Sequence, residues 1–305
     1  MKTAASHLSA LQLTSVASLA ARLPAFITLM KPRVMALAVF TALVGLMIAP
    51  ARPDPVLGFI AILAIAAGGG AAGVLNMWYE ADVDAMMTRT ARRPIPRGTV
   101  KGPEALAFGL ILACNSVLVL ALAANFKAAA LLALAIFFYV AVYTVWLKRS
   151  TPQNIVIGGA AGALPPMIGW AAAGGDFAVE PLVLFLIIFL WTPPHFWALS
   201  LNRTDEYARA GVPMLPVVAG SGATKRQILI YSIILFPVSL LPWALGFASA
   251  IYGATAAISG AAFIALTLKL VRSNAADRAP AHHVFAFSIL YLFVLFAALL
   301  AGKGV

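Results

Sequence analysis

Charged residues are scarce in this chain. Only 10% of its 305 residues are Asp, Glu, Lys or Arg, whereas 63% are hydrophobic and the mean hydropathy is +0.97. Ordinary soluble domains have roughly a quarter of their residues charged, so this shortage excludes a water-soluble globular protein. The composition indicates an integral membrane protein.

Cysteine is almost absent as well. The single cysteine, Cys114, lies inside an apolar run, which excludes a disulfide within the chain and any thiolate metal cluster. The first residues lack acids and a long apolar core, so a cleaved secretory signal is not expected. We interpret residues 1–30 as a partly amphipathic cytoplasmic lead-in and residues 31–305 as a single transmembrane domain.

Long apolar runs are the most frequent feature of the sequence. A bilayer is crossed by about 20 apolar residues in a helix. Nine runs approach this length: 34–50, 57–79, 103–126, 128–147, 153–175, 181–201, 227–247, 249–270 and 284–301. They are continuous and do not alternate as barrel strands do. The fold class is therefore predicted to be all-α, a polytopic membrane bundle of nine transmembrane helices. Pro193-Pro194 predicts a kink just before His195 that opens a cavity inside the bundle.

The basic residues are distributed unevenly between these runs. Of the 21 Lys and Arg, 18 fall in the N-terminal stretch or in loops on its side of the membrane, and only Arg52, Lys127 and Lys303 fall on the other side. The positive-inside rule then places the N-terminus in the cytoplasm. The net charge of +11 is thus mainly a topology signal, which favours anionic ligands at that face and gives no support for nucleic acid.

Acidic residues are rarer still, and three of the ten lie within residues 80–84. On a helix, Asn76, Glu80 and Asp84 follow one another at four-residue spacing and share a face, whereas Asp82 points elsewhere. Mg²⁺ prefers oxygen ligands of this kind and is commonly held by one or two carboxylates together with substrate phosphates. A solvated loop is the alternative interpretation, although it explains the carboxylates less well than the nearby arginines.

Basic side chains that could bind phosphate follow this ladder. Arg89, Arg92, Arg93 and Arg97 come directly after it, and Lys148-Arg149 lie in a loop predicted on the same side. Together the groups suit a magnesium-bridged diphosphate. Positive-inside flanks would also account for the cations, and for the KPR stretch at 31–33 this alternative is the stronger one.

A second polar group ends the sixth apolar run. His195, Asn202 and Glu206 are seven and four residues apart, which predicts a shared helical face, with Asp205 and Tyr207 beside it. One ladder could hold a metal ion and the other complete its ligand shell. A satisfied core histidine and ordinary loop charges remain the alternatives.

At these residues the sequence resembles the UbiA-type intramembrane prenyltransferases, and most closely their heme-specific branch. The resemblance spans nearly the whole chain after the lead-in. It rests on four stretches in order: KPRVMAL (31–37), NMWYEADVDAMMTRTARRP (76–94), YTVWLKRSTPQNIVIGG (143–159) and WTPPHFWALSLNRTDEYARAGVPMLPVV (191–218). Two positions depart from the general family pattern, since Met77 replaces an aspartate and Glu80 replaces another. The second motif has Asp205-Glu206-Tyr207 where Asp-Asp-Tyr is frequent, which leaves open which acid would touch metal.

The resemblance implies roles for these residues. Asn76, Glu80 and Asp84 would hold Mg²⁺ against the diphosphate of farnesyl diphosphate, and Asp205 and Glu206 would bind a second ion or complete the first. The leaving diphosphate would be neutralised by the basic residues Arg89, Arg93, Lys148 and Arg149. His195 is the best candidate for a heme contact, with His282 and His283 weaker ones.

The implied reaction transfers a farnesyl group to a vinyl group of protoheme IX with addition of water, which gives heme O and diphosphate. The expected setting is a bacterial inner membrane, with the site facing the cytoplasm and the lipid bilayer as a partner. A heme A synthase is a further partner that the resemblance leaves open. The alternatives are an aromatic prenyltransferase, such as one acting on 4-hydroxybenzoate, and a membrane transporter. A CDP-alcohol phosphotransferase would need a D-G-x-x-A-R element, which the sequence lacks.

Overall fold

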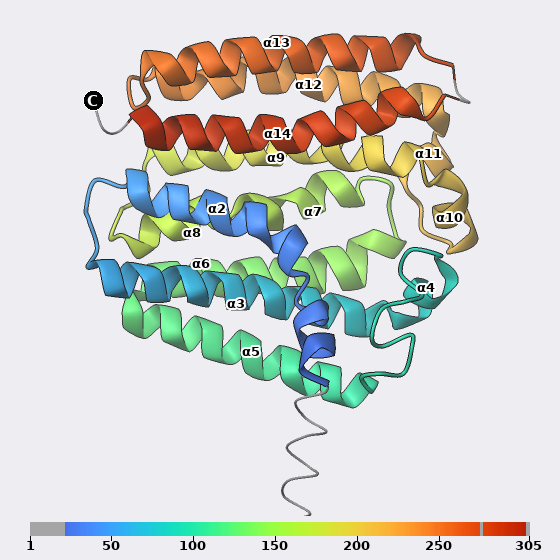
Figure 1. The fold of residues 1–305 in the computed structure, drawn as a ribbon, viewed down its shortest axis with the longest axis horizontal. Coiled ribbons are helices and arrows are strands. Elements are labelled where there is room, and N and C mark those ends of the chain that lie inside the picture. The colour runs from blue at the N-terminus through green and yellow to red at the C-terminus, as the bar shows by residue number, and fades with distance from the viewer. Residues whose placement is uncertain (1–21, 275–276, 303–305) are drawn as a thin grey trace, which may run out of the picture.

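Long helices run side by side and make up most of the described structure, with short helices and loops joining them (Figure 1). This computed structural model describes residues 22–274 and 277–302, so residues 1–21 of the predicted lead-in lie outside the described residues. Within that part of the chain, eight helices are long and apolar enough to cross a membrane. A ninth span results if the helix Arg22–Leu29 and α2 (Pro32–Ile48), which meet at 52°, form one bent span. An all-helical bundle of eight to nine spans agrees with the predicted fold class.

Six of the eight spans are single helices and two are composite. The eight spans are α3 (Pro55–Tyr79), α5 (Gly102–Ala123), Phe126–Arg149, Asn154–Ala172, α9 (Val179–Leu201), α12 (Gly220–Ala244), α13 (Ala250–Arg272) and α14 (Ala279–Ala301). The third is composite: α6 (Phe126–Phe137) continues as a π-helix, η1 (Phe138–Trp146), and ends in a 3₁₀ turn, η2 (Leu147–Arg149). The fourth consists of α7 (Asn154–Ala163) and α8 (Pro165–Ala172), separated at a proline, which lacks the N–H that would continue the helix.

Apolar side chains lie both inside the bundle and on its flanks. The buried core includes Leu184, Tyr252, Phe263 and Phe296. Leu122, with 78% of its surface exposed, is one of many large apolar side chains that face outward. Exposed apolar surface on this scale is costly in water and is expected where lipid is the solvent.

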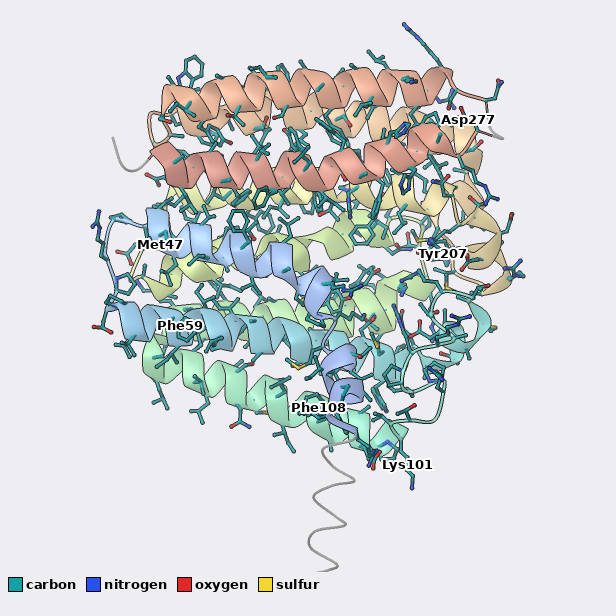
Figure 2. All side chains as sticks on the ribbon, in the orientation of Figure 1. Met47, Phe59, Lys101, Phe108, Tyr207 and Asp277 are labelled. Carbon is teal, nitrogen blue, oxygen red and sulfur yellow. The ribbon has the colours of Figure 1, made fainter. Side chains whose placement is uncertain are left out.

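The short helices gather at one end of the bundle. α4 (Ala81–Met86), α10 (Thr204–Arg209) and α11 (Leu215–Val218) lie at the right in Figure 1, where α3 and α9 end. Lys101, Tyr207 and Asp277 lie at that end, and Met47 and Phe59 lie toward the opposite one (Figure 2). Two motifs that are far apart in the sequence therefore reach the same face of the molecule.

Candidate functional site

The first polar ladder forms a buried row of oxygen atoms. α3 ends at Tyr79, yet the backbone N–H of Glu80 still donates to Asn76 O at 3.0 Å and that of Asp84 to Glu80 O at 2.8 Å. The four-residue register therefore continues into α4. The exposed fractions are 3% for Asn76, 2% for Glu80 and 3% for Asp84, so all three side chains are buried on one face, as their spacing predicts.

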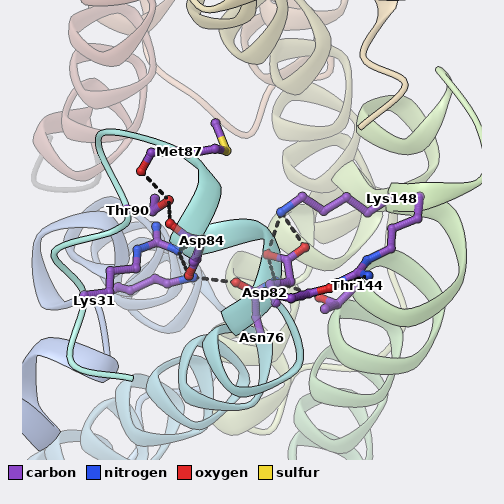
Figure 3. A network of polar contacts seen from close by, with 11 residues as sticks. Lys31, Asn76, Asp82, Asp84, Met87, Thr90, Thr144 and Lys148 are labelled. Carbon is purple, nitrogen blue, oxygen red and sulfur yellow. Dashed lines mark hydrogen bonds and ion pairs between the residues drawn. The ribbon is translucent and has the colours of Figure 1, made fainter. Parts of the chain in front are cut away.

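Each buried carboxylate is paired with a basic side chain (Figure 3). Lys148 Nζ lies 2.5 Å from Glu80 Oε1 and 2.6 Å from Oε2. Arg93 Nη1 contacts both oxygens of Asp84, at 2.8 and 2.6 Å. Removing one member of a buried pair leaves an uncompensated charge, which costs about 3–5 kcal/mol. Two of the predicted diphosphate cations, Arg93 and Lys148, therefore neutralise two of the predicted metal ligands.

Asn76 lies between Lys31, from the KPR stretch that the sequence analysis ranked lowest among the basic groups, and Thr144, which it did not single out. Lys31 Nζ donates to Asn76 Oδ1 at 2.7 Å, and Asn76 Nδ2 donates to Glu80 Oε2 at 2.9 Å and to Thr144 Oγ1 at 3.0 Å. For Lys31 the signal was the KPR stretch at 31–33, whose lysine directly precedes the first residue of α2. For Thr144 the sequence carries no such signal, since its placement depends on the π-helix.

An unusual backbone conformation brings Lys31 to the ladder. Lys31 is the non-glycine residue with positive φ among the described residues, at φ 53° and ψ 51°, in the bend before α2. This bend packs closely on α3, where a Cβ on Gly70 would lie 2.8 Å from Met30 Cε. The absence of a side chain at Gly70 thus allows the bend to approach, about one and two-thirds turns of helix before Asn76.

Arg149, another of the predicted cations, is paired outside the buried ladder. Arg149 donates to both oxygens of the exposed Asp82, at 3.0 and 2.7 Å, and this guanidinium lowers the pKa of the Asp82 carboxyl. Asp82 thus points away from the buried ladder, as predicted. It holds Arg149 at the rim of the site.

Arg89 connects the two sequence motifs electrostatically. Part of its surface is exposed, but the surrounding protein removes enough water to lower the pKa of its guanidinium. Its charged and titratable neighbours include Arg93 and Asp84 from the first motif and Tyr207 and Arg203 from the second. The end of α4 and the start of α10 therefore share one electrostatic environment.

The second ladder does not form as predicted. α9 ends at Leu201 and α10 begins only at Thr204, so the helical register that would align His195, Asn202 and Glu206 is interrupted. Asn202 Nδ2 instead donates to the backbone oxygen of Arg278 at 3.3 Å. The expectation of one shared helical face is wrong, because the chain turns at Asn202–Arg203.

The two acids of this motif differ in their surroundings. Asp205 is exposed, whereas Glu206 accepts from Arg203 at 3.2 Å through Oε1. Its other oxygen, Oε2, is buried and has no hydrogen-bond partner among the described residues. A buried carboxylate oxygen normally has a partner, so this atom is suited to a ligand or a cation.

His195 is packed into the bundle. α9 continues through Pro193-Pro194 as one α-helix, and the imidazole stacks on Trp191 and Phe285 at centroid distances of 4.2 and 4.7 Å. Its Nδ1 forms a 2.6 Å hydrogen bond with Ser288 Oγ. The predicted cavity beside His195 is thus filled by aromatic rings from α9 and α14. His282 and His283 are exposed and lie in the first turn of α14.

The ligand types nevertheless fit a hard divalent cation. In the described part of the chain, no three His, Cys, Asp or Glu side chains are close enough together to hold a metal ion as they stand. The candidate donors are all oxygen atoms: the Asn76 amide, the Glu80 and Asp84 carboxylates and the unpartnered oxygen of Glu206. Oxygen donors without sulfur or imidazole are typical of Mg²⁺ sites.

Comparison with known proteins relates this geometry to a family. Residues 38–293 match the UbiA prenyltransferase family. A protoheme IX farnesyltransferase of Afipia carboxidovorans is 61% identical over 276 residues, which cover 90% of this chain and 88% of that protein. One from Azorhizobium caulinodans is 60% identical over 278 residues, which cover 90% of this chain and 91% of the relative.

Solved structures share the fold at lower identity. A structure of digeranylgeranylglyceryl phosphate synthase has a TM-score of 0.76 at 20% identity, with 92% of this chain and 98% of that chain covered. A UbiA homolog from Archaeoglobus fulgidus bound to DMAPP and Mg²⁺ has a TM-score of 0.64 at 18% identity, with 89% and 99% covered. These likenesses establish the helical architecture.

Proposed function

The chain belongs to the UbiA prenyltransferase family, and from its identity of about 60% with protoheme IX farnesyltransferases we infer that it transfers the farnesyl group of farnesyl diphosphate to a vinyl group of protoheme IX. Water adds in the same reaction, and the products are heme O and diphosphate. The observation that carries this inference is the match over 90% of the chain to enzymes of this one activity.

We propose that the buried ladder is where the diphosphate binds. Its carboxylates already lie against Arg93 and Lys148, which supply positive charge beside the proposed metal ligands. Lys31 and Arg89 add two further cations at the same end of the bundle. Arg149, held by Asp82 at the rim, is placed to meet the diphosphate as it enters.

We propose that Mg²⁺ would be held by Asn76, Glu80 and Asp84. From the second motif, Glu206 is a better candidate ligand than the exposed Asp205, because its Oε2 is buried and has no hydrogen-bond partner among the described residues. When bound, Mg²⁺ would stabilise the negative charge that develops on the departing diphosphate. The cations of the chain do the same through direct hydrogen bonds, which are strongest where water is excluded.

The bond changes then balance as follows. The C1–O bond of farnesyl diphosphate breaks, and the electrons leave with the diphosphate. The terminal carbon of the vinyl group forms a bond to C1, which leaves a cation on the carbon next to the pyrrole ring. Water attacks that carbon and loses a proton, so the product carries a hydroxyethylfarnesyl chain.

A membrane setting suits a substrate that has an apolar chain and a charged head group. The protein is a multi-pass membrane protein whose close relatives are bacterial. We propose that it lies in the inner membrane with the ladder facing the cytoplasm, because basic residues are concentrated at that end. The farnesyl chain would then extend into the apolar bundle while its diphosphate stays at the charged face.

The product's mass tests the proposed reaction. Purified protein is incubated with protoheme IX, farnesyl diphosphate and Mg²⁺, and the extracted hemes are analysed by mass spectrometry. We expect a product heavier than protoheme by one farnesyl group and one hydroxyl group, absent when EDTA is included. A folded protein that gives no such product but prenylates 4-hydroxybenzoate would be an aromatic prenyltransferase, whose reaction loses a ring proton and adds no water.

A heme contact by His195 remains a prediction, and the structure gives this side chain a competing packing role. If His195 binds heme, a His195→Ala variant should bind hemin more weakly and with an altered absorption spectrum. A spectral titration of both proteins decides this. Unchanged affinity and spectrum would leave His195 as a core residue that joins α9 to α14.

A further inference from the structure

We propose that Thr144 is a positioning residue, whose hydroxyl holds the Asn76 amide with its oxygen turned toward the bound cation. This inference rests on the proposed function of the ladder. Thr144 is fully buried on the π-helix η1, and its side chain joins that helix to α3 (Figure 3).

The direction of each hydrogen bond in this contact is fixed. Thr144 Oγ1 donates to the backbone oxygen of Tyr139 at 2.8 Å, and a carbonyl oxygen can only accept. The single hydroxyl proton is therefore committed, and only lone pairs of Oγ1 face Asn76. Asn76 must then present its NH₂ group, which donates at 3.0 Å.

The opposite side of the amide agrees with this assignment. Lys31 Nζ lies 2.7 Å from Asn76 Oδ1, and in its ammonium form it can only donate. A rotated amide would place its oxygen against the lone pairs of Thr144 and the carboxylate of Glu80, and its NH₂ against an ammonium. Three contacts thus oppose the rotation.

Thr144 differs from the other acceptor of this amide. Glu80 is a candidate metal ligand, so its contact with Asn76 changes when a cation draws the carboxylate away. The Thr144 hydroxyl has no such second task. Because it stays in place, it would keep Oδ1, the Asn76 atom that would ligate a hard cation, on the side where Lys31 Nζ lies.

The π-helix explains why Thr144 lies here. Its hydrogen bonds run from residue i to i−5, so the Thr144 side chain returns to the carbonyl of Tyr139, five residues earlier. The ring of Tyr143 packs against α7, where a Cβ on Gly158 would lie only 2.2 Å from Tyr143 Cδ2. That close approach holds η1 in its position beside Asn76.

The test compares Thr144→Val, which keeps the shape but removes the hydroxyl, with Thr144→Ser, which keeps the hydroxyl. Affinity is measured by electron paramagnetic resonance of Mn²⁺ in the presence of farnesyl thiolodiphosphate, an analogue that does not react. Ligands outside the metal's own shell typically contribute 10–100-fold to affinity, so the valine variant should bind Mn²⁺ about 10–100-fold more weakly. The serine variant should stay close to the unsubstituted protein.

Two results would overturn the proposal. The first is a valine variant that binds Mn²⁺ as tightly as the unsubstituted protein. The second is an equal loss of affinity in the serine and valine variants, which would mean that packing and not the hydroxyl matters. If the valine variant does not fold, Thr144→Ala replaces it in the same comparison. Product formation by the unsubstituted protein is measured first. An active protein with an unaffected valine variant refutes only the role of Thr144, whereas an unsubstituted protein that forms no product refutes the proposed function.

Discussion

Farnesyl transfer is expected to fall by at least about 100-fold when Glu80 is replaced by Gln or Asp84 by Asn, because electrostatic stabilisation of the leaving group is worth several kcal/mol. Each substitution removes one negative charge from a buried side chain that we propose as a metal ligand, while keeping its shape. Each also leaves a cation, Lys148 or Arg93, without its partner. The initial rate of heme O formation at saturating Mg²⁺ measures the effect.

Asp82→Asn is the matched control for these variants. It removes the same charge from the same short segment, but Asp82 is exposed and paired with Arg149 at the rim. We therefore expect a much smaller loss of rate. Equal losses at residues 80, 82 and 84 would show that the overall charge of the segment matters and that no buried ladder is involved. Membrane insertion is checked for all three variants by gel filtration in detergent.

Mg²⁺ and the diphosphate substrate are expected to increase each other's affinity. A metal ion that binds alone must displace Lys148 or Arg93 from a carboxylate, which leaves a cation unpaired in a buried site. A diphosphate that binds alone meets cations that are already neutralised. When both bind, the carboxylates take the metal and the cations take the diphosphate, so every charge has a partner.

This coupling is measured by titrating Mn²⁺ with and without farnesyl thiolodiphosphate. Coupling between two sites is reciprocal and commonly lies between about 5- and 150-fold, and we expect at least tenfold here. Lys148→Met should reduce it, because Glu80 then accepts a metal without first losing a partner. A blank without protein corrects for chelation by the analogue. Metal affinity that does not depend on the analogue contradicts the exchange of ion pairs.

The sequence predicted the architecture and the first ladder well, because both depend on local periodicity. Apolar run length gives the spans, and four-residue spacing gives the shared face of Asn76, Glu80 and Asp84. The four-residue backbone hydrogen bonds persist past the end of α3, so the break at Glu80 did not disturb this register. The side chain of Asp82 turned outward for the same reason.

The failures occurred where tertiary packing overrides periodicity. The second ladder was predicted by extending one helix through Asn202, but the chain turns there. The cavity expected beside His195 is filled by the ring of Phe285, from a helix far along the sequence. Thr144 was missed because its position depends on a π-helix. Lys31, in the KPR stretch, was ranked too low because its contact with Asn76 joins two segments 45 residues apart.

The π-helix also determines where this chain tolerates insertions and deletions. One residue more or less in an α-helical segment rotates everything beyond it by about 100°. Between Phe138 and Trp146 such a change would turn Lys148 away from Glu80 while α6, packed on α5 and α8, stayed in place. The loop between α2 and α3, at the opposite end of the bundle, carries none of these side chains and can vary in length without this penalty. The length of η1 is therefore as much a part of the site as the identity of its residues.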